Sequence, residues 1–177
     1  MKLVLKFGGT SLASPKDITN VAKTIASFSK GNEIVVVCSA VDGVTDTLIL
    51  ISTMIEQKKK KEVADALAGL VKKHKKLADQ TIKNSVVKKQ LLEKLNADVS
   101  ELQELVRGLT LLKEVSARSL DYLISFGERL SDDLVSFALQ DLKKKSTALN
   151  GKEVGIVTDS NFGESRPLMD TTRIRIS

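Results

Sequence analysis

Residues Ile34 to Cys38 form an unbroken run of apolar, mostly β-branched side chains. Such a run is typical of a strand that is covered on both faces, as the strands of parallel sheets are. A shorter apolar segment, Leu3 to Lys6, precedes it, and apolar residues recur at helical spacing between the two, from Ile18 to Phe28. Strand, helix and strand at this spacing predict a parallel βαβ unit and therefore an α/β fold.

The ends of the first predicted helix carry recognisable signals. Ser14 can cap the helix with its hydroxyl, and Pro15 suits the first helical position, where no backbone N–H is needed. Lys30, Gly31 and Asn32 are expected to end it. After the second strand we expect a turn and then a helix that Thr45 caps.

The middle of the chain, from about residue 59 to 112, has a purely helical pattern. It predicts a helical hairpin with a first helix from about Glu62 to Ile82 and a break at Asn84-Ser85. We expect this hairpin to serve as packing or oligomer surface, because its residue types offer little chemistry. A further long helix is predicted from about Val115 to Leu142.

The last thirty residues are expected to return to an α/β pattern. Val154 to Val157 is a second short apolar run, Thr158 to Gly163 is a turn-rich loop, and Thr172 to Ser177 alternates like a strand. A doubly wound domain rarely ends on an extended segment, so we expect these residues to be part of a larger domain.

Charge and composition exclude several classes of protein. The 28 Lys and Arg outnumber the 22 Asp and Glu, which gives a net charge of +6. The lysine runs, such as Lys72 to Lys76, alternate with leucines at helical spacing, and aromatic residues make up only 3%. We therefore expect solvated helix faces and no nucleic-acid partner.

No apolar run approaches the roughly 20 residues of a membrane span, and no signal peptide is visible, so a cytoplasmic location is expected. Cys38, the single cysteine, excludes an intramolecular disulfide and a cysteine-based zinc site, and no metal site is predicted.

The strongest candidate site follows the first predicted strand, at Lys6-Phe7-Gly8-Gly9-Thr10-Ser11. Glycines let backbone amides approach an anion closely, and the adjacent lysine adds a compact positive charge. Loops at the carboxyl ends of parallel strands are where open α/β sheets bind ligands, so a phosphate group is the expected ligand. The spacing fits neither of the common glycine-rich nucleotide motifs, and a tight turn beside a chance lysine is the alternative.

Two further segments are candidates for ligand binding. The loop Ser39 to Thr45 follows the second strand and should open on the same edge of the sheet, although plain turn chemistry would explain it equally well. Glu128 interrupts an apolar flank of the long helix, either as a ligand-binding carboxylate or as one half of a structural ion pair. Gly127 beside it suggests close approach of another backbone or a ligand. Arg129 is assigned a structural role only.

Together, these segments resemble the amino acid kinase family and, within it, the aspartate kinases. Lys6 to Ser11 matches the K-F-G-G-T-S opening, Ser39 to Thr45 resembles the S-A-x-x-G-x-T loop, and Phe126 to Ser131 resembles the G-E-x-x-S helix. Thr158 to Phe162, with Arg166-Pro167, resembles the loop that follows in that family.

The resemblance implies an incomplete three-layer αβα sandwich with a mainly parallel sheet and a helical hairpin insertion. It implies phosphoryl transfer from ATP, with Mg²⁺, to the side-chain carboxylate of L-aspartate, the first step toward lysine, threonine and methionine. Lys6 would contact the transferring phosphoryl group, and Glu128 would hold the substrate ammonium group. The residues implied for the nucleotide are Lys6, Phe7, Gly8, Gly9, Thr10 and Ser11. Those implied for the substrate are Ser39, Thr45 and Glu128.

The resemblance also bears on domain organisation. Residues 1–177 correspond to the N-terminal portion of the catalytic domain, without a regulatory ACT domain, so we expect activity to need the rest of that domain. The full-length protein is expected to be a homo-oligomer. Another member of the family, with a different substrate, and a non-catalytic interaction fragment are the alternatives.

Overall fold

The computed structural model describes residues 1–176 and is built on a pair of parallel strands. Strands β1 (Lys2–Phe7) and β2 (Glu33–Cys38) pair along their whole lengths, and α1 (Pro15–Phe28) connects them. The predicted βαβ unit is therefore confirmed, and with it the α/β fold class. A short 3₁₀ helix, η1 (Gly9–Leu12), fills the turn between β1 and α1.

The first helix begins as its sequence indicates. The Ser14 hydroxyl accepts a hydrogen bond from the backbone N–H of Asp17 at 3.2 Å, and Pro15 occupies the first helical position. The buried side of the helix consists of residues at helical spacing: Ile18, Val21, Ala22 and Ile25. Satisfied caps and one apolar face place this helix against the rest of the molecule.

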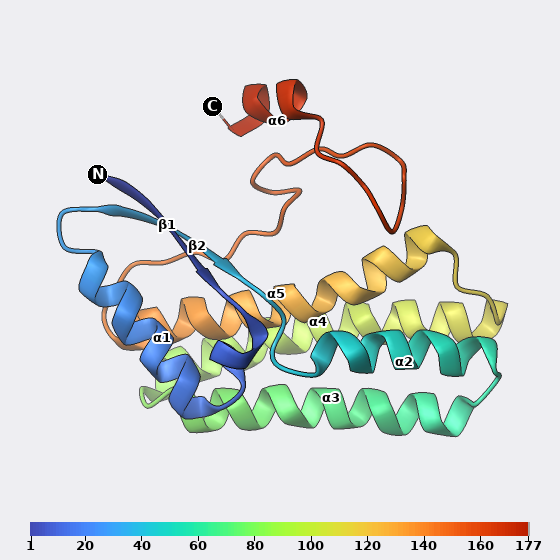
Figure 1. Ribbon diagram of the computed structural model, residues 1–177. Coiled ribbons are helices and arrows are strands. Elements are labelled where there is room, and N and C mark those ends of the chain that lie inside the picture. Colours follow the sequence, from blue (N-terminus) through green and yellow to red (C-terminus); the bar gives the residue numbers. More distant parts are fainter. Residues whose placement is uncertain (177) are drawn as a thin grey trace.

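Four further helices form a bundle beneath the sheet, as Figure 1 shows. They are α2 (Val44–Glu56), α3 (Lys60–Thr81), α4 (Ser85–Leu112) and α5 (Ala117–Asp141). Helix α5 packs against α1, α2 and α4, so it connects the bundle to the βαβ unit. The predicted helical hairpin is confirmed as α3 and α4. Asn84 caps α4, accepting from the N–H groups of Val86 and Val87 at 3.0 and 3.1 Å.

The two faces of the sheet differ. Leu5 and Val36 point to the helices and pack on a core that includes Leu12 and Phe126, both fully buried. On the opposite face Val4, Val35 and Val37 are 70%, 56% and 45% exposed. The expectation that Ile34 to Cys38 is covered on both faces is therefore wrong for residues 1–176, because the bundle lies on one side of the strand pair.

The C-terminal part also departs from expectation. Residues 169–176 form a helix, α6 (Met169–Ile176), where a strand was predicted for 172–177, and Ser177 lies outside the described residues. Within Val154 to Val157, the first two residues belong to a turn and the last two to an irregular segment, and a single antiparallel bridge joins Thr158 to Pro167. With no neighbouring strand within reach, these short segments satisfy their backbone groups locally.

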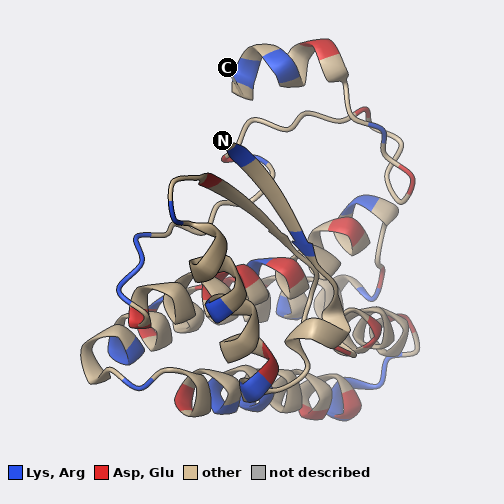
Figure 2. Ribbon diagram, turned by 60° about the vertical axis from the view of Figure 1, so that its left-hand side comes forward, with Lys and Arg blue, Asp and Glu red and all other residues tan. Residues whose placement is uncertain are grey.

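Charge is spread over the helices, with Lys and Arg interleaved with Asp and Glu in Figure 2. Lys72, Lys75 and Lys76 on α3 are exposed, as expected of a solvated face. Lys73 is half-buried and differs, since its ammonium donates a hydrogen bond to the backbone carbonyl of Asp42. Among residues 1–176, no helix has the length and apolar character needed to cross a membrane.

Candidate phosphate and substrate site

The glycine loop begins where β1 ends. Gly8 is extended, and its carbonyl accepts from the N–H of Ser11 at 3.0 Å as η1 begins. The first amides of a helix have no acceptor within it, so η1 presents free N–H groups beside the end of the strand. A Cβ placed on Gly8 would meet nothing within 4 Å, which leaves open space in front of this backbone. These features suit a phosphate group.

Lys6 stands at the start of this loop with an exposed side chain. It forms no ion pair with any residue from 1 to 176, unlike Lys2 on the same strand, whose ammonium lies 3.8 Å from Glu33. An unpaired ammonium beside free backbone amides makes this end of β1 electropositive.

The second loop lies directly against the first. The N–H of Ser39 donates to the Phe7 carbonyl at 3.0 Å, continuing the strand pairing. A Cβ placed on Gly9 would lie 3.0 Å from the carbonyl oxygen of Ala40 and 3.6 Å from Cα of Asp42. Glycine is therefore required at position 9 for the two loops to touch, and the expectation that they open on one edge of the sheet is confirmed.

The start of α2 differs in detail from the prediction. Gly43, at φ 71°, occupies the N-cap position, and Thr45 lies within the first turn, so the predicted capping by Thr45 is wrong. The carbonyl of Gly43 accepts from both the N–H and the hydroxyl of Thr47, at 3.1 and 2.8 Å. The half-buried Thr45 side chain therefore does not cap the helix, and it lies at the end of the loop.

Helix α5 brings Glu128 to this loop. A Cβ placed on Gly127 would lie 2.8 Å from the Cβ of Ala40, so the expected close approach is confirmed and its partner is the 39–45 loop. One turn later, the buried Ser131 hydroxyl donates to the Ser39 carbonyl at 2.7 Å. Glu128 lies between these contacts, half-buried and without a hydrogen bond or ion pair from its carboxylate to any described residue. The structural ion pair considered for Glu128 is therefore not formed within residues 1–176.

One residue at this site was missed by sequence reasoning. Asp132 follows Glu128 by one helical turn and interacts with the Cys38 thiol at the end of β2. Burial raises the pKa of Asp132 to about 6, and the Glu128 carboxylate also raises it, while the thiol opposes this. Burial, with Asp132 beside it, raises the pKa of Cys38 to about 12, so the thiol stays protonated and unreactive. The i, i+4 spacing from Glu128 was the signal available in the sequence.

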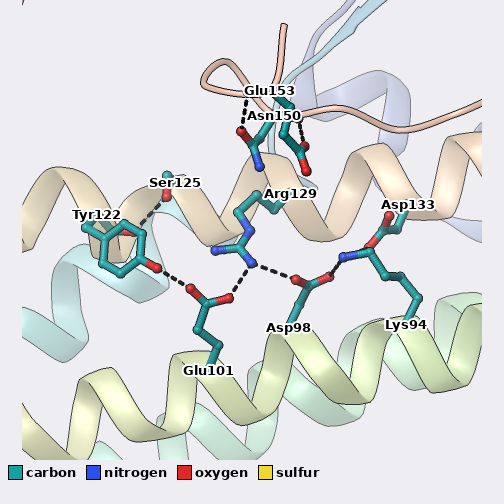
Figure 3. A network of polar contacts seen from close by, with 9 residues as sticks. All are labelled: Lys94, Asp98, Glu101, Tyr122, Ser125, Arg129, Asp133, Asn150 and Glu153. Atoms are coloured by element: carbon teal, nitrogen blue, oxygen red, sulfur yellow. Dashed lines mark hydrogen bonds and ion pairs between the residues drawn. The ribbon is translucent and has the colours of Figure 1, made fainter. Parts of the chain in front are cut away.

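The opposite side of α5 carries a polar network to α4, drawn in Figure 3. The Arg129 guanidinium donates to Asp98 at 2.7 Å and to Glu101 at 2.6 Å, and it stacks 4.3 Å above the Phe126 ring. The Lys94 ammonium lies 2.7 Å from Asp98. These contacts hold the two helices together, and the structural role expected for Arg129 is confirmed.

Asp133 belongs to the same network. Burial and its hydrogen bond to Asp98 raise the pKa of Asp133 to about 7. Burial would also raise the pKa of Asp98, but bonds from Lys94, Asp133 and Arg129 hold it below its usual value. A proton taken up by the pair therefore lies on Asp133, while Asp98 stays ionised.

The site thus joins three of the predicted segments. Backbone and side-chain contacts connect the loop of Lys6 to Ser11, the loop of Ser39 to Thr45 and the α5 turn of Glu128. Lys6 and Glu128 do not contact each other, and each keeps its charge unpaired within residues 1–176. In that part of the chain no three His, Cys, Asp or Glu residues gather where they could hold a metal ion.

Comparisons with known proteins match this chain to the amino acid kinase family and to aspartokinases. A model of the amino acid kinase family matches residues 1–175. Aspartokinase 1 of Arabidopsis thaliana, a chloroplastic protein, is 29% identical over 169 residues, which cover 90% of this chain and 27% of that protein. The aspartokinase of Corynebacterium glutamicum is 28% identical over 175 residues, 98% of this chain and 28% of the other. The chain therefore spans less than a third of the length of these relatives.

Solved structures agree on the fold. Aspartokinase III of E. coli, in complex with lysine and aspartate, superposes with a TM-score of 0.82 at 22% identity. The match covers 97% of this chain and 36% of that one. The same enzyme with aspartate and ADP gives a TM-score of 0.80. The strand pair, the two loops and the bundle therefore have the arrangement found in that fold, of which this chain holds a part.

Proposed function

Because the chain belongs to the amino acid kinase family, we propose that it supplies the phosphate loop and part of the amino acid site of an aspartate kinase. The observation that carries this proposal is that two opposite charges, each without a partner, lie on segments that the 39–45 loop connects. Lys6 lies at the start of one loop, Glu128 lies on the helix that packs against the next loop, and neither has a partner among residues 1–176. A substrate with an ammonium group and a phosphate donor would satisfy both charges.

In the proposed reaction an oxygen of the aspartate side-chain carboxylate bonds to the γ-phosphorus of ATP. The bond from that phosphorus to the β,γ-bridging oxygen breaks, and ADP leaves with the electron pair. Such transfers need positioning and charge neutralisation more than covalent help from the protein. Lys6 would neutralise the transferring phosphoryl group, and the amides of Gly8, Gly9 and Thr10 would bind phosphate oxygens. Phe7 and Ser11 complete that loop.

The amino acid would lie along the second loop. We propose that the Glu128 carboxylate binds the substrate ammonium, and that Ser39 and Thr45 offer hydroxyls beside it. Asp132 adds a second carboxylate one turn away, although burial favours its protonated form below pH about 6. Since no metal-binding group gathers within residues 1–176, we expect Mg²⁺ to enter bound to phosphate oxygens of ATP, where it would neutralise charge.

The remaining part of the catalytic domain is also a proposal. The apolar sheet face formed by Val4, Val35 and Val37 is open, and the two strands have unpaired outer edges within residues 1–176. We propose that residues 1–177 form the N-terminal portion of the domain and need further strands to complete the sheet and the adenine pocket. We call residues 1–177 together with these further strands, on one chain or two, the complete catalytic unit. A cytosolic location fits the single unpaired cysteine, and a homo-oligomer is expected of the full-length protein.

The test is substrate choice by the complete catalytic unit. With MgATP and hydroxylamine, L-aspartate should yield the aspartyl hydroxamate and ADP in equal amounts, well ahead of L-glutamate or carbamate. Glu128→Gln should raise the KM for aspartate about tenfold or more through loss of a charged contact, and leave the KM for ATP within twofold. Glu104→Gln, on the exposed side of α4, is the matched control. Preference for another carboxylate would redirect the proposal to another member of the family. Salt-sensitive retention on DNA, without turnover of any amino acid, would favour the non-catalytic alternative.

A further inference from the structure

The Ser131 hydroxyl occupies the joint between α5 and the end of β2. Its side chain belongs to a residue that is 1% exposed, and its oxygen lies 2.7 Å from the Ser39 carbonyl and 2.9 Å from the Glu128 carbonyl. The hydroxyl therefore has two backbone acceptors within hydrogen-bond distance, one in each segment proposed to bind the amino acid. Ser39 and Ser131 are 92 residues apart in the sequence.

The same joint is pressed together by packing. Gly127 lies against Ala40, and Val44 and Leu48 of α2 lie 3.5 and 3.6 Å from the position that its Cβ would take. Packing alone fixes how closely the helix approaches, but it does not fix how the helix turns relative to the loop. A directional hydrogen bond does so. Within residues 1–176, Ser131 makes the only side-chain hydrogen bond from α5 to the 39–45 loop.

We propose that Ser131 is a positioning residue, which sets the distance between the Glu128 carboxylate and the hydroxyls of the 39–45 loop. The inference rests on the proposed function, since it predicts an effect on amino acid binding. The Ser131 hydroxyl itself faces backbone carbonyls and would not touch the substrate. Its loss should therefore weaken binding of the amino acid, while the phosphate loop, which it does not contact, keeps its affinity for ATP.

A structural role alone would predict a different result, and α5 offers a matched control. Ser136 is 6% exposed on the same helix, and its hydroxyl donates to Ser146 at 3.2 Å, away from the 39–45 loop. Ser131→Ala and Ser136→Ala each remove one buried, hydrogen-bonded hydroxyl, so similar losses of stability are expected. Any difference between the two variants in loop exchange or in amino acid binding is then due to the place of the hydroxyl in the structure, and not to the loss of a buried hydrogen bond as such.

The first measurement uses the 177-residue chain and needs no activity. In amide hydrogen exchange, Ser131→Ala should speed exchange of residues 40–45 about tenfold, as loss of one buried hydrogen bond allows, and Ser136→Ala should leave those residues unchanged. Ser131→Cys, which keeps a small side chain of the same shape but donates weakly, should fall between the wild type and Ser131→Ala. Equal effects of Ser131→Ala and Ser136→Ala on the loop would overturn the inference.

The second measurement uses the complete catalytic unit. Ser131→Ala should raise the KM for aspartate about tenfold and leave the KM for ATP within twofold, and Ser136→Ala should change neither. An unchanged KM for aspartate despite a loosened loop would also overturn the inference. If the wild-type unit phosphorylates another amino acid instead, the proposed function fails. The comparison of Ser131→Ala with Ser136→Ala on that substrate still decides the positioning role.

Discussion

Gly127 and Ala40 approach so closely that a Cβ added to Gly127 would lie 2.8 Å from the Cβ of Ala40. Neither group is the end of a flexible side chain, so any larger residue at 127 must push the helix away from the loop. A glycine that is unfavourable for the helix is thus explained by the packing of the site.

This contact predicts opposite effects of the same substitution at different glycines. Gly127→Ala should lower the free energy of unfolding by about 1–3 kcal/mol, because overpacking exceeds the gain in helix propensity. Gly69→Ala in α3, where a Cβ meets nothing within 4 Å, should raise it by about 0.5–1 kcal/mol. Urea denaturation of the 177-residue chain measures both. Equal stabilisation by the two substitutions would show that α5 does not press on the loop.

The network between α4 and α5 predicts a pH dependence of stability. The folded-state pKa of Asp133, about 7, lies above the usual aspartate value of 3.8, so folding favours its protonated form. The resulting stabilisation is fully present below pH about 4 and is lost as the pH rises through about 7. Asp132, with a pKa of about 6, acts in the same direction.

Asp133→Asn should remove part of this dependence, because an amide cannot titrate but can still donate to Asp98. The urea midpoint of the wild type should fall relative to that of Asp133→Asn between pH 4 and pH 7.5. Asp65→Asn, on the exposed part of α3, should follow the wild type. Parallel curves for the wild type and Asp133→Asn would contradict the raised pKa.

Lys73 connects the helical hairpin to the 39–45 loop, through the hydrogen bond from its ammonium to the Asp42 carbonyl. Lys73→Met keeps the apolar stem and removes this donor, so amide exchange of residues 42–45 should speed up about fivefold, the effect of about 1 kcal/mol. Lys76→Met, on the exposed face of the same helix, should have no effect there. If both substitutions leave the loop unchanged, Lys73 belongs to the solvated face like its neighbours.

The sequence was a good guide wherever local signals decide the structure. Ser14 caps the helix it was expected to start, the helical hairpin breaks at Asn84 as predicted, and β2 lies where its β-branched run predicts. The alternation from Thr172 to Ile176 was misleading, because a strand needs a partner. Ile174 and Ile176 are 79% and 58% exposed in α6, so burial does not hold that segment in either form.

The candidate site also has features that local sequence signals reveal and features that they do not. The glycine loop and Glu128 could be found from residue type and spacing. The hydrogen bond from Ser131 to Ser39 and the bond from Lys73 to Asp42 could not, because each depends on how α5 or α3 packs against a distant loop. Tertiary packing of this kind leaves no local pattern in the chain.

Lys6 is proposed to serve phosphoryl transfer to aspartate. The most direct test compares hydroxamate formation by the complete catalytic unit for Lys6→Ala and for Lys2→Ala. Both lysines lie exposed on β1, but Lys2 faces Glu33 at the far end of the strand. Lys6→Ala should lower turnover by about 10²- to 10³-fold, the usual effect of removing a group that stabilises developing charge, while Lys2→Ala retains it. Near-normal turnover in Lys6→Ala would contradict the account.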